Sequence, residues 1–140
     1  MTGANAGPVP QWGRSTAAVS GGILAVFVLS LGTDQILHMA NVYPLWGQPM
    51  FDTGLLLLAT AYRAVYSTVG GCITARLAPH NSMRHVRVLV IVGFVLGLMG
   101  IGAAISMPDL SPLWYPIAVA VTGPPMSWLG GMLFRPTARG

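Results

Sequence analysis

The chain has 140 residues, of which 54% are hydrophobic and only 7% are charged. Soluble domains carry about 25% charged residues, so this composition excludes an ordinary soluble protein and predicts one integral membrane domain. The formal net charge of +4 does not indicate nucleic-acid binding, because most arginines flank apolar segments and form no basic run. Cys72 is the only cysteine, which excludes an internal disulfide.

Four apolar segments are long enough to cross a membrane, which takes about 20 residues per helix. The expected helices span residues 16–39, 53–77, 86–107 and 113–134. Residues 1–15 are expected to form a flexible tail, and residues 135–140 a second tail. Because lipid offers no hydrogen-bond partners, each span should be a complete α-helix. The sequence therefore predicts an all-α membrane protein built as a four-transmembrane-helix bundle.

The first apolar segment has a second interpretation, as a secretory signal peptide that is removed from the mature chain. The run is long, and Asp34 and His38 follow it directly, with no small-residue cleavage site at its end. We therefore expect this segment to remain as a membrane helix.

Basic residues fall on one side of the expected bundle. The two connections on the opposite side contain Asp52 and Asp109 but no arginine. Cytoplasmic loops of membrane proteins are enriched in Lys and Arg, so both termini are expected in the cytoplasm. The arginines that indicate this orientation are Arg14, Arg76, Arg84, Arg87, Arg135 and Arg139.

Aromatic residues and prolines gather in the two connections on the non-cytoplasmic side. Tyr and Trp are enriched at membrane interfaces, and the expected anchors are Tyr43, Trp46, Trp114 and Tyr115. Both connections contain Pro-Leu-Trp, and the helix after each ends in Gly-Gly followed by an arginine. This similarity indicates two repeated helical hairpins; the alternative is that both hairpins share the common features of membrane interfaces.

Glycines predict the surfaces where helices pack closely. Gly93 and Gly97 form a GxxxG pair, a spacing that allows helix backbones to approach. The expected packing residues are Gly70, Gly71, Gly93, Gly97, Gly130 and Gly131. These surfaces can serve packing within the chain, or contact with a second copy or another membrane protein. Pro124 and Pro125 in the fourth helix predict a kink.

Arg63 lies well inside the second helix, about 15 Å from its start at 1.5 Å per residue. A charge at such a depth costs about 2.5–3.5 kcal/mol on insertion scales, and an anionic partner reduces this cost. Asp34 is the acid within reach, because the first two helices are antiparallel neighbours. An arginine fork can bond both oxygens of a carboxylate, so we expect an ion pair.

Helical spacing extends this pair to a polar site. Asp34 and His38 are four residues apart, as are Arg63 and Ser67, and Tyr66 is adjacent to Ser67. Facing these stripes would make one outward-opening intramembrane site. Three interpretations stay open: a structural salt bridge, a proton or anion site in which Asp34 or His38 titrates, and an Arg63 that extends toward the interface without a partner.

Asp34 and His38, with Asp52, also have the chemistry of metal ligands, but no fourth ligand is evident. The sequence therefore predicts neither a metal nor a cofactor. It also contains no evident nucleophile–base pair and no glycine-rich phosphate loop, so we do not expect an enzyme.

Several strings, "TDQILHMANVYPLWGQPM", "AYRAVYSTVGGCITARLAPHNSMRH", "LWYP" and "WLGGML", are distributed over roughly residues 30–134. In them the chain resembles a family of small, four-helix, uncharacterised bacterial inner-membrane proteins. The resemblance implies a location in a bacterial inner (plasma) membrane. It implies no activity, ligand or partner.

The sequence thus favours a non-enzymatic accessory or structural subunit of a homo-oligomer or larger membrane complex. The alternative is a small oligomeric transporter or ion or proton conductor that uses Asp34, His38 and Arg63 and takes a small-molecule or ion ligand. The chain matches small multidrug transporters only in size and helix count. Their membrane acid is a glutamate, and this chain has none.

Overall fold

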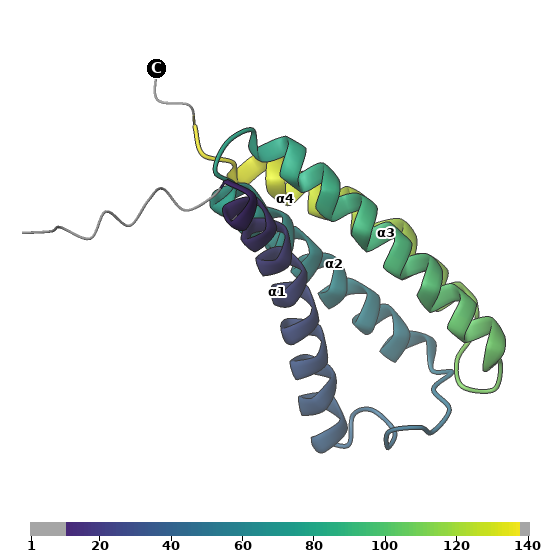
Figure 1. The fold of residues 1–140 in the computed structure, drawn as a ribbon. Helices are drawn as coiled ribbons and strands as arrows, with labels where there is room; N and C mark the ends of the chain where they lie inside the picture. Colours follow the sequence, from purple (N-terminus) through teal and green to yellow (C-terminus); the bar gives the residue numbers. More distant parts are fainter. Residues whose placement is uncertain (1–10, 138–140) are drawn as a thin grey trace, which may run out of the picture.

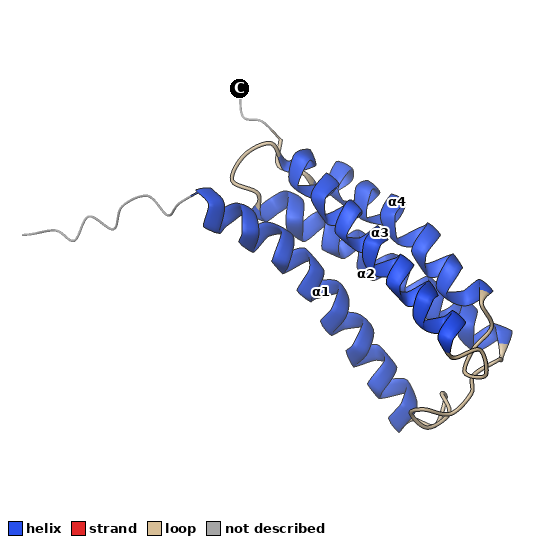
Figure 2. Cartoon of the chain, turned by 45° about the vertical axis from the view of Figure 1, so that its right-hand side comes forward, coloured by secondary structure: helices blue, strands red, loops and turns tan. Residues whose placement is uncertain are grey.

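The computed structural model describes residues 11–137, which form four α-helices (Figure 1). The helices are α1 (Gln11–Met39), α2 (Thr53–Leu77), α3 (Ser82–Ser106) and α4 (Trp114–Phe134). All four are long and apolar enough to cross a membrane, and the described residues contain no strand (Figure 2). The predicted all-α, four-helix membrane fold is confirmed.

The start of α1 differs from the predicted boundary. The helix begins at Gln11, so the last part of the predicted tail, residues 1–15, is helical; residues 1–10 lie outside the described residues. An apolar pattern marks only the part of a helix that lipid surrounds. Polar residues such as Arg14 can continue the helix into the headgroup region, where water can bond the free backbone groups at its end.

The same effect moves the start of α3. This helix begins at Ser82 and not at residue 86, and Asn81 precedes it with a left-handed backbone (φ 46°). α2 spans the predicted residues 53–77, and the other predicted helix ends agree to within one residue. Of the second predicted tail, the residues up to 137 are described and non-helical, whereas Arg139 lies outside the described residues.

Asp52 explains why α2 begins where it does. Its carboxylate accepts a hydrogen bond from the backbone N–H of Leu55 at 3.0 Å. Aspartate at this position satisfies a backbone donor that the first helical turn leaves free, and its charge complements the helix dipole. Asp52 is therefore a helix cap.

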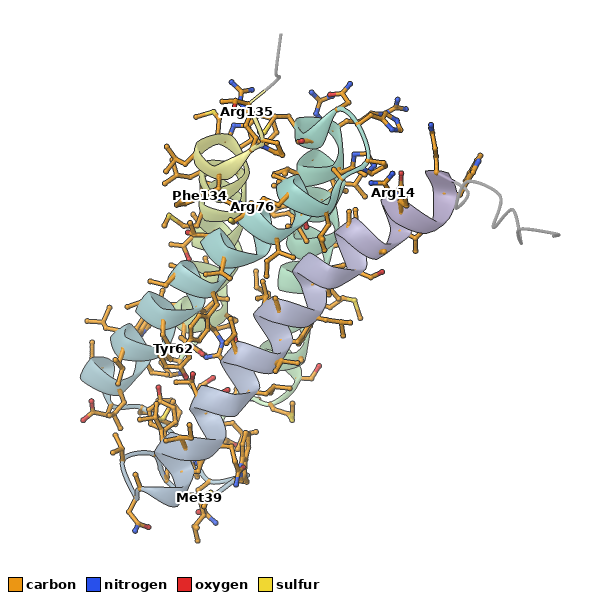
Figure 3. All side chains as sticks on the ribbon, turned by 90° about the vertical axis from the view of Figure 1, so that its left-hand side faces the viewer. Arg14, Met39, Tyr62, Arg76, Phe134 and Arg135 are labelled. Carbon is orange, nitrogen blue, oxygen red and sulfur yellow. The ribbon has the colours of Figure 1, made fainter. Side chains whose placement is uncertain are left out.

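α2 occupies the centre of the bundle, where it packs against α1, α3 and α4, and α4 also packs against α3. Among the described helices, α1 does not pack against α4. We call the end where α1 begins and α4 ends the arginine end, because Arg14, Arg76 and Arg135 gather there (Figure 3). Toward the far end, which carries Met39, α1 and α3 diverge (Figures 1 and 2).

Glycines bring α2 and α4 into backbone contact. A Cβ added to Gly71 would fall on the carbonyl oxygen of Ser127, and one added to Gly130 would fall on that of Thr68. Two helices can approach this closely only where side chains are absent. These contacts lie toward the arginine end and hold the two central helices together.

The other helix pairs use the same device. On α1 and α2, a Cβ at Gly70 would lie 3.0 Å from the Gly22 carbonyl oxygen, and Thr74 Oγ1 donates to the Ala18 carbonyl at 3.1 Å. Gly131 meets Val86, and Gly97 meets Ala120. Of the predicted packing glycines, only Gly93 has open space around an added Cβ.

The two prolines of α4 lie inside the helix, which continues from Trp114 to Phe134. Pro124 and Pro125 therefore remove two backbone donors without ending the helix.

Candidate intramembrane polar site

Arg63 of α2 and Asp34 of α1 form an ion pair, as the sequence predicted. Arg63 Nη2 lies 2.6 Å from Asp34 Oδ2, and Arg63 Nη1 donates to Asp34 Oδ1 at 3.4 Å. The Arg63 and Asp34 side chains are 24% and 9% exposed. Since the two bonds connect neighbouring antiparallel helices, they fix the position of α1 along α2.

Tyr62 belongs to this cluster, although the sequence analysis did not identify it. Its hydroxyl donates to Asp34 Oδ1 and accepts from Arg63 Nη1 at 3.2 Å. Figure 3 places Tyr62 between α2 and α1, in the half of the bundle that carries Met39. Consecutive helix positions point about 100° apart, so spacing assigned Tyr62 and Arg63 to different faces. The sequence did contain one sign of its role, because Tyr62 directly precedes an arginine inside a membrane helix.

Tyr43, in the connection after α1, extends the cluster toward the far end. It is 5% exposed, and its hydroxyl lies 3.2 Å from that of Tyr62 and donates to the Leu55 carbonyl at 3.4 Å. Burial raises the pKa of the Tyr43 hydroxyl above its ordinary value, and the hydrogen bond with Tyr62 partly opposes this shift. The predicted interface anchor is thus turned into the protein.

The other predicted anchors divide in the same way. Trp46 and Trp114 are 59% and 37% exposed, as an interface residue should be. Tyr115 is half-buried and lines a cavity together with Arg63. The two tyrosines therefore pack in the interior of the bundle, and the two tryptophans remain on its surface.

His38 does not join the predicted site. Its Nδ1 hydrogen-bonds the Pro44 carbonyl oxygen, and its ring packs against Trp46 with centroids 4.1 Å apart. The connection after α1 turns back at Asn41, whose φ is 57°, and so brings the Pro44 carbonyl to His38. The imidazole stabilises this turn and makes no hydrogen bond with Asp34 or Arg63.

Tyr66 and Ser67 lie near the ion pair without bonding it. The Tyr66 hydroxyl is 2.7 Å from Thr33 Oγ1, a further polar link between α2 and α1. Ser67 is buried and lines the cavity one turn of α2 beyond Arg63.

A cavity of about 500 Å³ lies between α1, α3 and α4, with α2 behind it. Most of its lining is apolar, and the α3 part of it includes the three glycines Gly93, Gly97 and Gly100. The polar residues on it are Ser30, Arg63, Ser67, Ser111, Tyr115 and Ser127. Of the two residues of the ion pair, Arg63 is part of this lining and Asp34 is not.

The alternative metal site is not assembled. Within residues 11–137, no three His, Cys, Asp or Glu side chains come close enough to hold a metal ion. Asp52 caps α2 and His38 bonds Pro44, so neither reaches Asp34. His80 and His85 pack against each other at the arginine end, where His85 Nε2 lies 2.9 Å from Ser15 Oγ.

Comparison of the chain with protein-family models, with curated proteins and with solved structures gives no match. The site must therefore be interpreted from its own chemistry. It combines one acid, one permanent cation and two phenols, and its arginine is one of the residues that line an apolar cavity.

Proposed function

We propose that the chain is a multi-pass protein of a bacterial inner membrane, the location that its resemblance implies, with both termini in the cytoplasm. The gathering of Arg14, Arg76 and Arg135 at one end supports this orientation (Figure 3). The test replaces Cys72 by alanine and introduces single cysteines. Trp46→Cys should react with an impermeant maleimide in spheroplasts, and Arg135→Cys only after permeabilisation. The reverse pattern would contradict the orientation.

We further propose that the chain is a non-enzymatic subunit, in a homo-oligomer or beside another membrane protein. The observation that carries this proposal is the shortness of the connections, at residues 40–52, 78–81 and 107–113. They are too short for a separate domain, so the described chain offers a partner mainly its membrane-embedded faces. Gly32 and Gly102 leave backbone open on such faces, since an added Cβ meets nothing within 4 Å.

Native mass spectrometry of gently extracted membranes tests this subunit role. We expect a complex of fixed stoichiometry, either of several copies or with a second protein. Gly32→Leu should lower the amount of complex without unfolding the chain. A monodisperse monomer in the native extract would exclude the proposal.

A second candidate function, a small transporter or an ion or proton conductor, is favoured by one observation. The Asp34, Arg63 and Tyr62 cluster borders a cavity inside the membrane-spanning region, and intramembrane ionisable groups commonly mark such pathways. We leave His38 out of this candidate site because its ring bonds the Pro44 carbonyl. pH-dependent flux in proteoliposomes should be lost in Asp34→Asn and Arg63→Gln; flux that persists in the double variant, which leaves no unpaired charge, would exclude this site.

A further inference from the structure

The cavity has the size and lining of a ligand site. Pockets for small molecules occupy about 300–1,000 Å³ and combine apolar walls with a few polar groups, and this one is about 500 Å³. Its lining includes Phe27 and Leu31 of α1 and Leu96 of α3, which are 45%, 54% and 37% exposed. The cavity therefore reaches the surface where α1 and α3 diverge (Figure 1), and this surface faces lipid in a membrane.

Ser30, one of the residues that line this cavity, has an unpaired hydroxyl. Its side chain is 7% exposed, and its Oγ has no hydrogen-bond partner among the described residues. Serine and threonine inside helices commonly bond the carbonyl one turn earlier, and Thr33 of the same helix does so at 2.8 Å. The Ser30 hydroxyl makes no such bond, and a buried polar group without a partner is costly.

Arg63, which belongs to the same lining, adds free donors. A guanidinium has five N–H groups. Three of them account for its bonds, two from Nη1, to Asp34 Oδ1 and the Tyr62 hydroxyl, and one from Nη2, to Asp34 Oδ2. Within the described residues, Nε and the second Nη2 hydrogen have no acceptor. Because Arg63 is one of the residues that line the cavity, these free N–H groups are the donors that we assign to it.

The charges decide which polar group suits these donors. Asp34 neutralises Arg63 through two contacts, so the cluster has no net positive charge left for an anion. An anionic head would place a second negative charge close to Asp34 in a medium of low dielectric constant, where the repulsion is strong. A neutral carbonyl oxygen accepts hydrogen bonds without this repulsion.

The depth of the donors excludes the headgroup of an ordinary phospholipid. Ser30 lies about 14 Å from the far end of α1, and Arg63 about 15 Å from the far end of α2, at 1.5 Å per residue. A phosphate at this depth would leave water for hydrocarbon, at a large cost. A neutral polar group attached to a long apolar chain can reach it.

We propose that this cavity binds a neutral lipophile whose polar head carries carbonyl-type acceptors, with its apolar chain between α1 and α3. The acceptors bond Ser30 and the free N–H groups of Arg63, and Ser67 lies on the same wall. This site goes beyond the proposed subunit role and does not depend on it. Binding is a property of the purified chain, whereas the subunit role is measured in native membranes.

The test uses three probes with the same sixteen-carbon skeleton and different heads: methyl palmitate, palmitate and hexadecane. Each is added to the purified full-length protein in detergent, and binding is measured by native mass spectrometry and by the shift in unfolding temperature. We expect methyl palmitate to bind at least about tenfold more tightly than either of the others. Tighter binding of palmitate would overturn the proposal that the ligand is neutral. Equal binding of all three probes would overturn the proposal that the cavity recognises a polar head.

Matched variants assign the binding to this cavity. Gly93→Leu and Gly100→Leu fill the cavity from positions where an added Cβ meets nothing within 4 Å, so both should fold and lose methyl palmitate. Gly102→Leu, equally open on α3 but outside the lining, is the control and should bind normally. Ser30→Ala should remove most of the preference for methyl palmitate over hexadecane. If the Gly93→Leu protein binds as the parent does, or if no probe binds the parent, the proposal is wrong.

Discussion

The two halves of this bundle are stabilised in different ways. Toward the arginine end, Gly71 and Gly130 allow α2 and α4 to touch through their backbones. Toward the far end, α1 is joined to α2 by side chains, with Asp34, Arg63 and Tyr62 in one hydrogen-bonded cluster. Glycine contacts therefore hold α1, α2 and α4 together toward the arginine end, whereas α1 and α3 part around a cavity toward the far end.

The largest loss of stability should come from placing a side chain in the backbone contact between α2 and α4. Gly71→Ala places a methyl group on the Ser127 carbonyl, and a backbone atom cannot move aside as a side chain can. We expect a loss of about 3 kcal/mol or more in the free energy of unfolding, measured by titration with SDS. Gly93→Ala is the matched control because its Cβ enters open space. Equal losses of unfolding free energy in the two variants would show that the backbone contact at Gly71 does not stabilise the bundle in particular.

The next largest effect should come from breaking the ion pair. Asp34→Asn leaves the Arg63 charge without its partner, which should cost about 3 kcal/mol. Adding Arg63→Gln should restore part of this stability, with a coupling energy of about 1 kcal/mol or more in a double-mutant cycle. Strictly additive losses would show that the two side chains do not stabilise each other in the membrane.

Removing one phenol should have a smaller effect. Tyr62→Phe keeps the ring but deletes the hydroxyl that bonds Asp34 and Arg63. We expect a loss of about 1–2 kcal/mol. Tyr66→Phe, which loses its contact with Thr33 but leaves the ion pair intact, is the comparison. A larger loss of stability in Tyr66→Phe than in Tyr62→Phe would contradict the role of Tyr62 in stabilising the ion pair.

The smallest effect should appear only in alkali. Because burial raises the pKa of Tyr43, its contribution to stability is complete below the ordinary value near 10 and is lost as the pH rises through the folded-state value. Tyr43→Phe should therefore lose less stability than the parent protein between about pH 9 and pH 11. Thermal unfolding across this range measures the difference, and parallel curves would show that Tyr43 does not titrate differently on unfolding.

The helices and the ion pair could be predicted because they follow from local rules. Apolar length determined the four spans, and Asp34 was the acid that an antiparallel neighbour could bring to Arg63. The starts of α1 and α3 were misplaced, since hydropathy does not mark where a helix ends in the headgroup region.

The rest of the site depends on the path of a connection and on helix divergence, neither of which has a periodic signal. Tyr43 turns inward and His38 is held by Pro44 because of the backbone conformation after α1, where Asn41 has a positive φ. The cavity exists because α1 leaves α3 toward the far end, a property of the whole bundle. A hydroxyl such as Ser30 looks ordinary in sequence and becomes unusual only where its neighbours are known.

The Asp34–Arg63 pair also has a consequence for how the chain enters the membrane. During synthesis α1 is made before α2, so Asp34 is already inserted when Arg63 arrives. On its own, Arg63 would oppose the insertion of α2 by about 2.5–3.5 kcal/mol, and the partner carboxylate reduces this cost. The first two helices should therefore be handled by the insertion machinery as one hairpin, with α1 acting as the internal chaperone of α2.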